Sequence, residues 1–170
     1  MAVIEGFRAE FLKYKALGEK AIAQLDGPQL SVAPPGGGNS IATICWHVAG
    51  NLRSRFTDFL TTDGEKPWRA RDEEFEAREV TRDALLEKWN SGWAALLEAF
   101  DGLDDRHLET PVTIRGESMS VLSALLRSLA HTSSHVGQIL YAAKMLKGPD
   151  WEYLSIPPGQ SETFNLKMRG

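Results

Sequence analysis

Cysteine is nearly absent from this sequence: Cys45 is the only one among 170 residues. A single cysteine cannot form an internal disulfide, and a chain of this length can bury a core without such cross-links. One free thiol suits a reducing compartment, so the composition predicts a cytoplasmic protein. The first residues, MAVIEGFRAEF, lack a basic region followed by a long apolar stretch, so no signal peptide is expected.

Long apolar runs and basic clusters are also missing. No run approaches the roughly 20 apolar residues of a membrane-spanning helix, so no membrane association is expected. The formal net charge is −4, with acidic and basic residues interleaved, and this pattern argues against a nucleic-acid partner. With 42% hydrophobic and 25% charged residues, the composition is that of an ordinary globular protein. The length predicts one domain over residues 1–170.

Apolar residues recur at spacings of three and four in four segments, which predicts four amphipathic helices. Asn39 or Ser40 can cap the second helix, and Ser118 or Ser120 the fourth. Gly27 and Pro28 are a plausible stop signal for the first helix. The four predicted helices cover approximately residues 3–25, 40–60, 81–100 and 118–146.

The connections differ in composition. Residues 34–38 (PPGGG) predict a loop, and residues 63–80 predict a long charged linker with at most one short helical turn. Residues 110–115 (TPVTIR) alternate apolar and polar, which predicts a short strand or extended connection. The tail, residues 151–170, is expected to be largely irregular. An all-α four-helix bundle is favoured, and a helical array of another connectivity is the alternative.

The histidines carry the main chemical signal. His131 and His135 are spaced i, i+4, so both project from one face of the fourth helix. They lie at the edge of its apolar arc, and His47 lies at the edge of the arc of the second helix. If these edges face each other, three imidazoles converge. An i, i+4 pair is also typical of a helix surface or a hydrogen-bonded core, and His107 is predicted to be solvated in a loop.

Three neutral imidazoles with open coordination positions suit zinc or nickel better than magnesium or calcium. The sequence HTSSH lacks the glutamate of the helical zinc-protease motif, which disfavours a metalloprotease. Cys45 lies on a different side of the helix from His47 and is predicted to be buried packing rather than a ligand or nucleophile.

Three stretches, together with the pattern of the first helix, carry a family resemblance over nearly the whole chain. They are NSIATICWHVAGNLRSRFTDFLTTDGEKPWRARDEEFE (residues 39–76), HTSSHVGQILY (131–141) and LSIPPGQS (154–161). The sequence resembles the DinB-like superfamily, and within it a branch of uncharacterised DinB-like proteins. That superfamily also includes bacillithiol-, mycothiol- and glutathione-dependent S-transferases.

The resemblance implies an up-down-down-up four-helix bundle, often dimeric, so a homodimer is expected. It also implies one divalent metal ion, commonly nickel or zinc, bound at the positions of His47, His131 and His135. For the transferase members it implies that the metal activates a thiol such as bacillithiol or glutathione, which then attacks an electrophile. The expected partners are therefore a small thiol and an electrophilic small molecule.

Three functional classes are compatible with these residues. A metal-dependent thiol S-transferase is favoured by the resemblance. A metal-dependent hydrolase would need a general base, and the sequence pattern identifies none. A non-enzymatic metal-binding dimer in a stress response is the third class, because the sequence shows no distinctive catalytic group beyond the metal ligands.

Three further residues are predicted to contact substrate. Asn51 lies one turn beyond His47, where it can orient a bound water or the substrate. Gln138, three residues after His135, is predicted to line the pocket or to hydrogen-bond to a ligand imidazole. Arg53, or Arg71 in the linker, is predicted to bind the carboxylate of a thiol cofactor.

The alternative interpretation of these charges is structural. Arg55 and Asp58 are spaced i, i+3 and can form an ion pair. The charged residues of the segment 63–72 can extend that pair into a lattice that holds the linker to the bundle. The sequence favours this lattice over an anion site.

Overall fold

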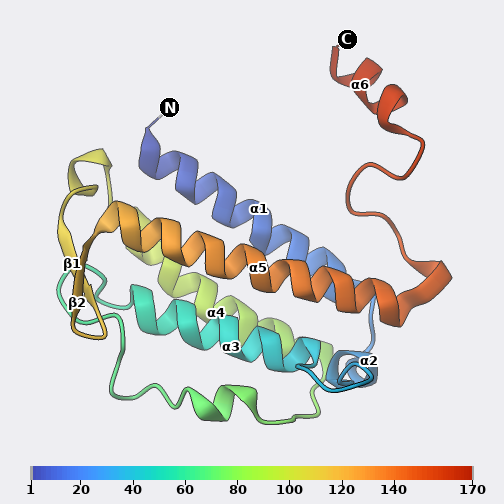
Figure 1. Ribbon diagram of the computed structural model, residues 1–170, viewed down its shortest axis with the longest axis horizontal. Coiled ribbons are helices and arrows are strands. Elements are labelled where there is room, and N and C mark those ends of the chain that lie inside the picture. The colour runs from blue at the N-terminus through green and yellow to red at the C-terminus, as the bar shows by residue number, and fades with distance from the viewer. Residues whose placement is uncertain (1, 170) are drawn as a thin grey trace.

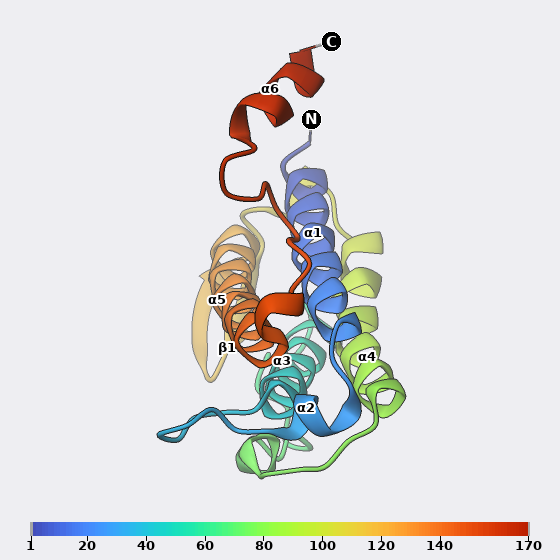
Figure 2. The ribbon, with the colours of Figure 1, turned by 90° about the vertical axis from the view of Figure 1, so that its right-hand side faces the viewer.

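Four long helices form the body of the protein: α1 (Val3–Ala23), α3 (Ile41–Phe56), α4 (Arg82–Asp101) and α5 (Val121–Lys147). They lie side by side in the computed structural model, which describes residues 2–169 (Figure 1, Figure 2). In Figure 1, α1 and α5 run from left to right, and α3 and α4 run from right to left. The prediction of a mostly helical protein is confirmed.

The starts of three long helices are fixed by hydroxyl caps. Ser40, Thr81 and Ser120 each accept a hydrogen bond from the backbone amide three residues further on, which satisfies an otherwise unpaired donor of the first turn. The caps of α3 and α5 are therefore Ser40 and Ser120, and not the alternatives Asn39 and Ser118. The predicted starts of these helices are confirmed.

The predicted end of the second helix, near residue 60, was wrong by one turn. α3 ends at Phe56, because Thr57 is extended and Asp58 has a left-handed backbone with φ 48°. The side chains of Ser54 and Arg55 then donate to the carbonyl oxygen of Gly64, which holds the returning chain against the end of α3.

Two helices were not predicted. α2 (Gly27–Ser31) begins where a stop was expected: Asp26 caps it, and Pro28 is tolerated in the first turn because the amide it lacks has no partner there. α6 (Ser161–Arg169) lies in the tail that was predicted to be irregular, and its apolar side chains Phe164, Leu166 and Met168 are exposed.

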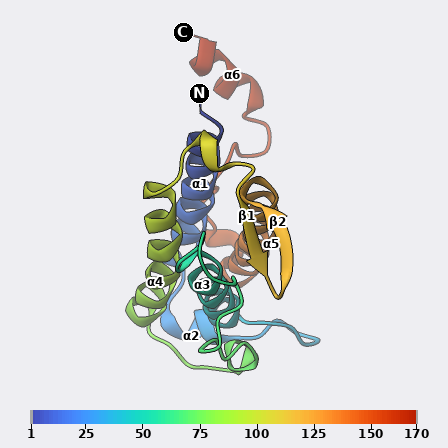
Figure 3. The ribbon, with the colours of Figure 1, turned by 90° about the vertical axis from the view of Figure 1, so that its left-hand side faces the viewer.

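A small antiparallel hairpin departs from an all-helical fold. β1 (Pro111–Ile114) pairs with β2 (Glu117–Ser120), and the two turn residues Arg115 and Gly116 both have positive φ, at 57° and 77°. The predicted extended segment at residues 110–115 is confirmed, with its partner strand in addition. The hairpin packs at the start of α5 (Figure 3), where Val112 and Ile114 are buried.

The core lies between the four long helices. Trp89 and Trp93 of α4 are fully buried, and Trp93 packs edge-on against Phe11 of α1 with ring centroids 6.3 Å apart. α3 and α4 approach so closely that a Cβ atom on Gly92 would lie 2.5 Å from the Cα of Ala49. This close contact, and the fully buried Cys45, fix α3 in place. Burial raises the pKa of the Cys45 thiol, in keeping with its predicted packing role.

A long linker, residues 57–81, returns along α3 to the start of α4 (Figure 1) and includes the short 3-10 helix η1 (Asp72–Phe75). The predicted Arg55–Asp58 ion pair was wrong, because the turn at Asp58 brings Glu65 to Arg55 instead, at 3.0 Å. Two more short 3-10 helices, η2 (Asp105–His107) and η3 (Gly148–Asp150), complete the elements. Within residues 2–169, no helix is both long and apolar enough to cross a membrane.

Candidate metal centre

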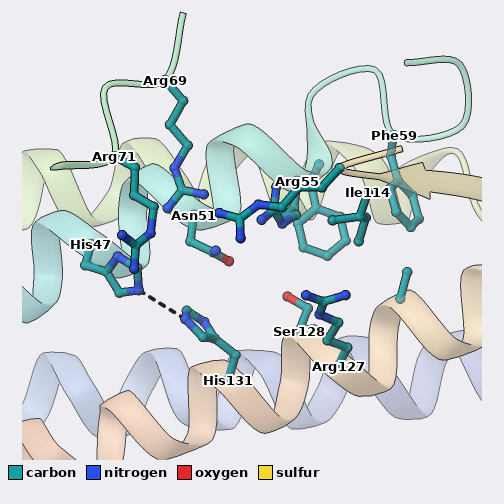
Figure 4. A pocket seen from close by; sticks show the side chains of 13 residues that line it. His47, Asn51, Arg55, Phe59, Arg69, Arg71, Ile114, Arg127, Ser128 and His131 are labelled. Atoms are coloured by element: carbon teal, nitrogen blue, oxygen red, sulfur yellow. Dashed lines mark hydrogen bonds between the residues drawn. The ribbon is translucent and has the colours of Figure 1, made fainter. Parts of the chain in front are cut away.

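Three histidines from two helices meet between α3 and α5. His47 lies on α3, and His131 and His135 lie one turn apart on α5. The Nε2 atom of His131 is 3.1 Å from Nε2 of His47 and 3.2 Å from Nε2 of His135. One nitrogen from each ring lies within 4.8 Å of the other two. Figure 4 shows His47 and His131 pointing toward each other across the gap between the helices.

The outer nitrogens of two of these rings have acceptors. Nδ1 of His47 is 2.9 Å from Oε2 of Glu74, and Nδ1 of His135 is 2.9 Å from Oε1 of Gln138. Because a carboxylate or amide oxygen can only accept, each Nδ1 carries the proton. In the neutral form of these two rings, the Nε2 atoms carry lone pairs that point inward, as in a metal ligand oriented by an outer partner.

His131 stands between the other two rings. Burial, followed by the nearby His135 and His47, lowers the pKa of His131 to about 3, so its imidazole is neutral at physiological pH. Its Nδ1 is buried and has no hydrogen-bond partner among residues 2–169. A neutral ring has one proton, so Nε2 of His131 can donate to only one of its two neighbours. At least one close pair of Nε2 atoms therefore lacks a proton between them.

The donor set fits a metal ion. Two nitrogens bound to one zinc ion at about 2.0–2.1 Å lie about 2.8–3.4 Å apart when the bonds meet at about 90–110°. The two separations that involve His131, 3.1 and 3.2 Å, fall in that range, and all three nitrogens lie within 4.8 Å of one another. A cation among the three Nε2 atoms would also relieve the repulsion between their lone pairs. The buried His triad can therefore hold a metal ion.

Glu74 supports the triad from the linker. Its carboxylate accepts from His47 and also from Nε and Nη2 of Arg69, both at 2.8 Å. Burial acts to raise the pKa of Glu74, but the hydrogen bonds from His47 and Arg69 outweigh it and keep the pKa below its ordinary value. Gly50 makes room for this carboxylate, because a Cβ there would lie 2.1 Å from Oε1 of Glu74. Phe75 packs on the His47 ring, with centroids 4.6 Å apart.

A pocket opens beside His47 and His131, between α3, α5, the linker and the hairpin (Figure 4). Its volume is about 180 Å³. Pockets that enclose a drug-sized ligand are typically about 300–1,000 Å³, so this one suits a small group. Its lining residues are His47, Asn51, Arg55, Phe56, Phe59, Arg69, Arg71, Ile114, Arg115, Ala124, Arg127, Ser128 and His131.

Comparison with known proteins places the chain in a family. The family described as "Protein of unknown function (DUF1572)" matches residues 2–160. The chain belongs to the DUF1572 family. No curated protein and no solved structure matches it.

In this DUF1572 protein the predicted site residues are only partly brought together. Asn51 lines the pocket beside the triad. Gln138 does not line that pocket, but it holds His135 by the hydrogen bond described above. Arg53 lies elsewhere: it stacks on Trp68, with its guanidinium carbon 4.9 Å from the ring centroid, in a separate surface depression. α3 directs it there because it is two residues from Asn51 and so points to a different side of the helix.

Several residues of the DUF1572 site were missed from the sequence. Glu74 lies 27 residues from His47 in the sequence. It stands among many charged residues of the linker, and nothing in that pattern indicated that this glutamate is the buried partner of His47. Arg127 and Ser128 precede His131 by four and three residues, so helical spacing alone was enough to place them on the same side of α5. Arg71, the alternative to Arg53 in the sequence interpretation, does line the pocket.

Proposed function

We propose that this protein is a member of the DinB-like superfamily in which His47, His131 and His135 bind one divalent ion, nickel or zinc, and that it transfers a small thiol to an electrophile. The observation that carries the proposal is the convergence of three imidazole nitrogens beside an open pocket. The opposite directions of the α1/α5 and α3/α4 pairs support the up-down-down-up bundle of that superfamily (Figure 1).

Imidazole donors select zinc or nickel over the harder ions magnesium and calcium. A bound zinc or nickel ion would lower the pKa of a thiol that reaches it, so that the thiolate is available near neutral pH. The residues of this chain hold the ligand rings in place: Glu74 orients His47, and Gln138 orients His135. The pocket then gives the second reactant access to the same side of the triad.

The geometry favours transfer over hydrolysis. Metal-dependent hydrolases of the helical zinc-protease type pair the metal-bound water with a carboxylate base. No aspartate or glutamate of the described chain lines the pocket, and Glu74 already accepts from His47 and Arg69. An S-transferase needs no such base, because a thiol whose pKa the metal has lowered would release its proton to solvent. The thiolate sulfur then forms the new bond while the leaving group departs with its electron pair.

Metal binding is tested first, with the purified full chain. We expect about one equivalent of zinc or nickel by elemental analysis, and thermal stabilisation of the metal-free protein by either ion. His131→Ala should abolish both effects. His107→Ala is the matched control, because His107 lies in η2, outside the triad, and should leave metal binding unchanged. Wild-type protein that binds neither ion would refute the metal site.

Thiol transfer is tested with the metal-loaded protein. Bacillithiol, mycothiol, glutathione and coenzyme A are each offered with a panel of electrophiles, and the conjugate is measured by mass spectrometry. We expect turnover with one thiol, lost in His131→Ala and retained in His107→Ala. Absence of turnover with every thiol in metal-loaded protein would favour the non-enzymatic metal-binding class.

A further inference from the structure

The pocket beside the His triad is strongly cationic. Five arginines line it, from α3, the linker, the hairpin turn and α5: Arg55, Arg69, Arg71, Arg115 and Arg127. Glu65 pairs with Arg55 at 3.0 Å and with Arg115 at 2.9 Å, while Glu74 pairs with Arg69. These two carboxylates face five guanidinium groups. Asp72 reaches Arg71 only at 3.6 Å and is fully exposed, so positive charge is in excess.

Two buried donors at the pocket make no hydrogen bond within residues 2–169. Ser128 is 7% exposed, and its Oγ makes no hydrogen bond within the described part of the chain. The Arg69 side chain is 2% exposed, and its Nη1 likewise has no hydrogen bond to residues 2–169; an oxygen of Glu65 lies 3.7 Å away. Buried polar groups in native proteins nearly always have a partner. Both donors are therefore available to acceptor atoms of a ligand in this pocket.

Arg127 adds a third free donor group. It is exposed at the pocket rim, one turn before His131, and the ion pairs and hydrogen bonds described for residues 2–169 include none of its own. Figure 4 shows it beside Ser128, on the α5 side of the pocket and facing Arg55 on α3. Figure 4 shows two apolar side chains, Phe59 of the linker and Ile114 of β1, on the side of the pocket away from His47.

We propose that this pocket binds a small organic acid, with its oxyanionic head group between Arg127, Arg69 and Ser128 and its apolar tail toward Phe59 and Ile114. The planar fork of a guanidinium matches a carboxylate or a phosphate with two parallel hydrogen bonds. The hydroxyl of Ser128 and Nη1 of Arg69 supply the remaining donors. The inference deepens the proposed function, on which it rests, because it takes the acid as one of the two reactants of the transfer.

The test is isothermal titration calorimetry of zinc-loaded full-length protein with four probes: hexanoate, hexyl phosphate, acetate and the neutral hexanamide. We expect hexanoate or hexyl phosphate to bind at least about tenfold more tightly than hexanamide, and the tighter of the two identifies the head group. Acetate should bind more weakly than hexanoate, because it lacks the tail. The titrations are repeated on metal-free protein, where the acid should still bind, since the arginines and Ser128 do not depend on zinc.

Variants locate the site. Arg127→Gln should weaken acid binding by about tenfold or more without changing the melting temperature, because Arg127 is exposed. Arg127→Lys keeps the charge but loses the fork, and should recover only part of the affinity. Ser128→Ala should weaken binding about threefold. Arg106→Gln is the matched control, an exposed arginine that does not line the pocket, and should bind as the wild type does.

Equal affinity of Arg127→Gln and wild-type protein for the acid would overturn the inference. It would also be overturned if neither hexanoate nor hexyl phosphate bound more tightly than hexanamide, or if the acid bound only when zinc is present. The proposed function fails separately. If acid binding depends on Arg127 but no thiol is transferred, the acid site stands and the transferase is refuted. If transfer occurs and Arg127→Gln leaves both acid binding and KM unchanged, the transferase stands and the acid site is refuted.

Discussion

Replacing Glu74 with glutamine tests whether the linker holds the His triad in place. Glu74 and Arg69 form a buried pair, with side chains 8% and 2% exposed. Removing one partner of a buried pair costs about 3–5 kcal/mol, because the other charge is left buried without compensation. Glutamine retains one acceptor oxygen, so we expect the low end, about 3 kcal/mol. For a chain of this size that loss lowers the melting temperature by about 6–12 °C.

The same variant should also weaken metal binding. Without the carboxylate, the proton on Nδ1 of His47 loses its charged acceptor, and the ring is less strongly oriented with its lone pair inward. Loss of such an outer partner typically costs 10–100-fold in metal affinity. We therefore expect zinc to bind about 10–100-fold more weakly to Glu74→Gln than to the wild type, while the stoichiometry stays the same.

Thermal denaturation of metal-free protein and zinc titration against a competing chelator measure the two effects. Glu73→Gln is the matched control, because Glu73 is a neighbouring glutamate of η1 that is exposed and does not touch the triad. It should change neither the melting temperature nor the zinc affinity appreciably. If Glu74→Gln melts and binds zinc as the wild type does, the assigned role of Glu74 is wrong.

Two further substitutions test the packing that positions the site. Gly92→Ala should destabilise the protein by about 1–3 kcal/mol in urea unfolding, because the new Cβ meets backbone atoms of Ala49 at 2.5 and 2.6 Å. Its control, Gly137→Ala, places a Cβ where no atom lies within 4 Å and should stabilise α5 by about 0.5–1 kcal/mol; equal effects at the two positions would contradict the argument. Asp63→Asn should loosen the hairpin turn, because Asp63 accepts from the backbone amides of Glu65, Gly116 and Arg115. These hydrogen bonds, that from Glu65 first, lower the pKa of Asp63 below its ordinary value of 3.8. The stability that ionised Asp63 contributes to the fold is therefore complete above pH 3.8. It is lost as the pH falls through the pKa of Asp63 in the folded protein, which is lower than 3.8. The unfolding free energies of Asp63→Asn and the wild type should differ by a constant amount from pH 5 to pH 7 and converge in stronger acid, and convergence already above pH 5 would contradict this.

The helices were predictable because their signals are local. Ser40, Thr81 and Ser120 each precede an apolar periodic segment, and a cap satisfies amides only three residues away. α2 was missed because its local signal is ambiguous. Pro28 can begin a helix as well as follow one, and the local pattern around it does not distinguish the two. The partner of Arg55 was wrongly assigned, because the left-handed turn at Asp58 was not visible in the spacing.

The sequence by itself determined the edge positions of His47, His131 and His135 on their helices, because helical periodicity fixes the side on which each residue lies. Only the tertiary structure decided that these edges face each other, since that depends on how α3 and α5 cross. It also decided which charges reach the site: Glu74 and Arg69 enter from the linker, while Arg53 points away toward Trp68. Contacts between residues far apart in the sequence follow from the path of the whole chain, and the spacing of residues within one segment carries no information about them.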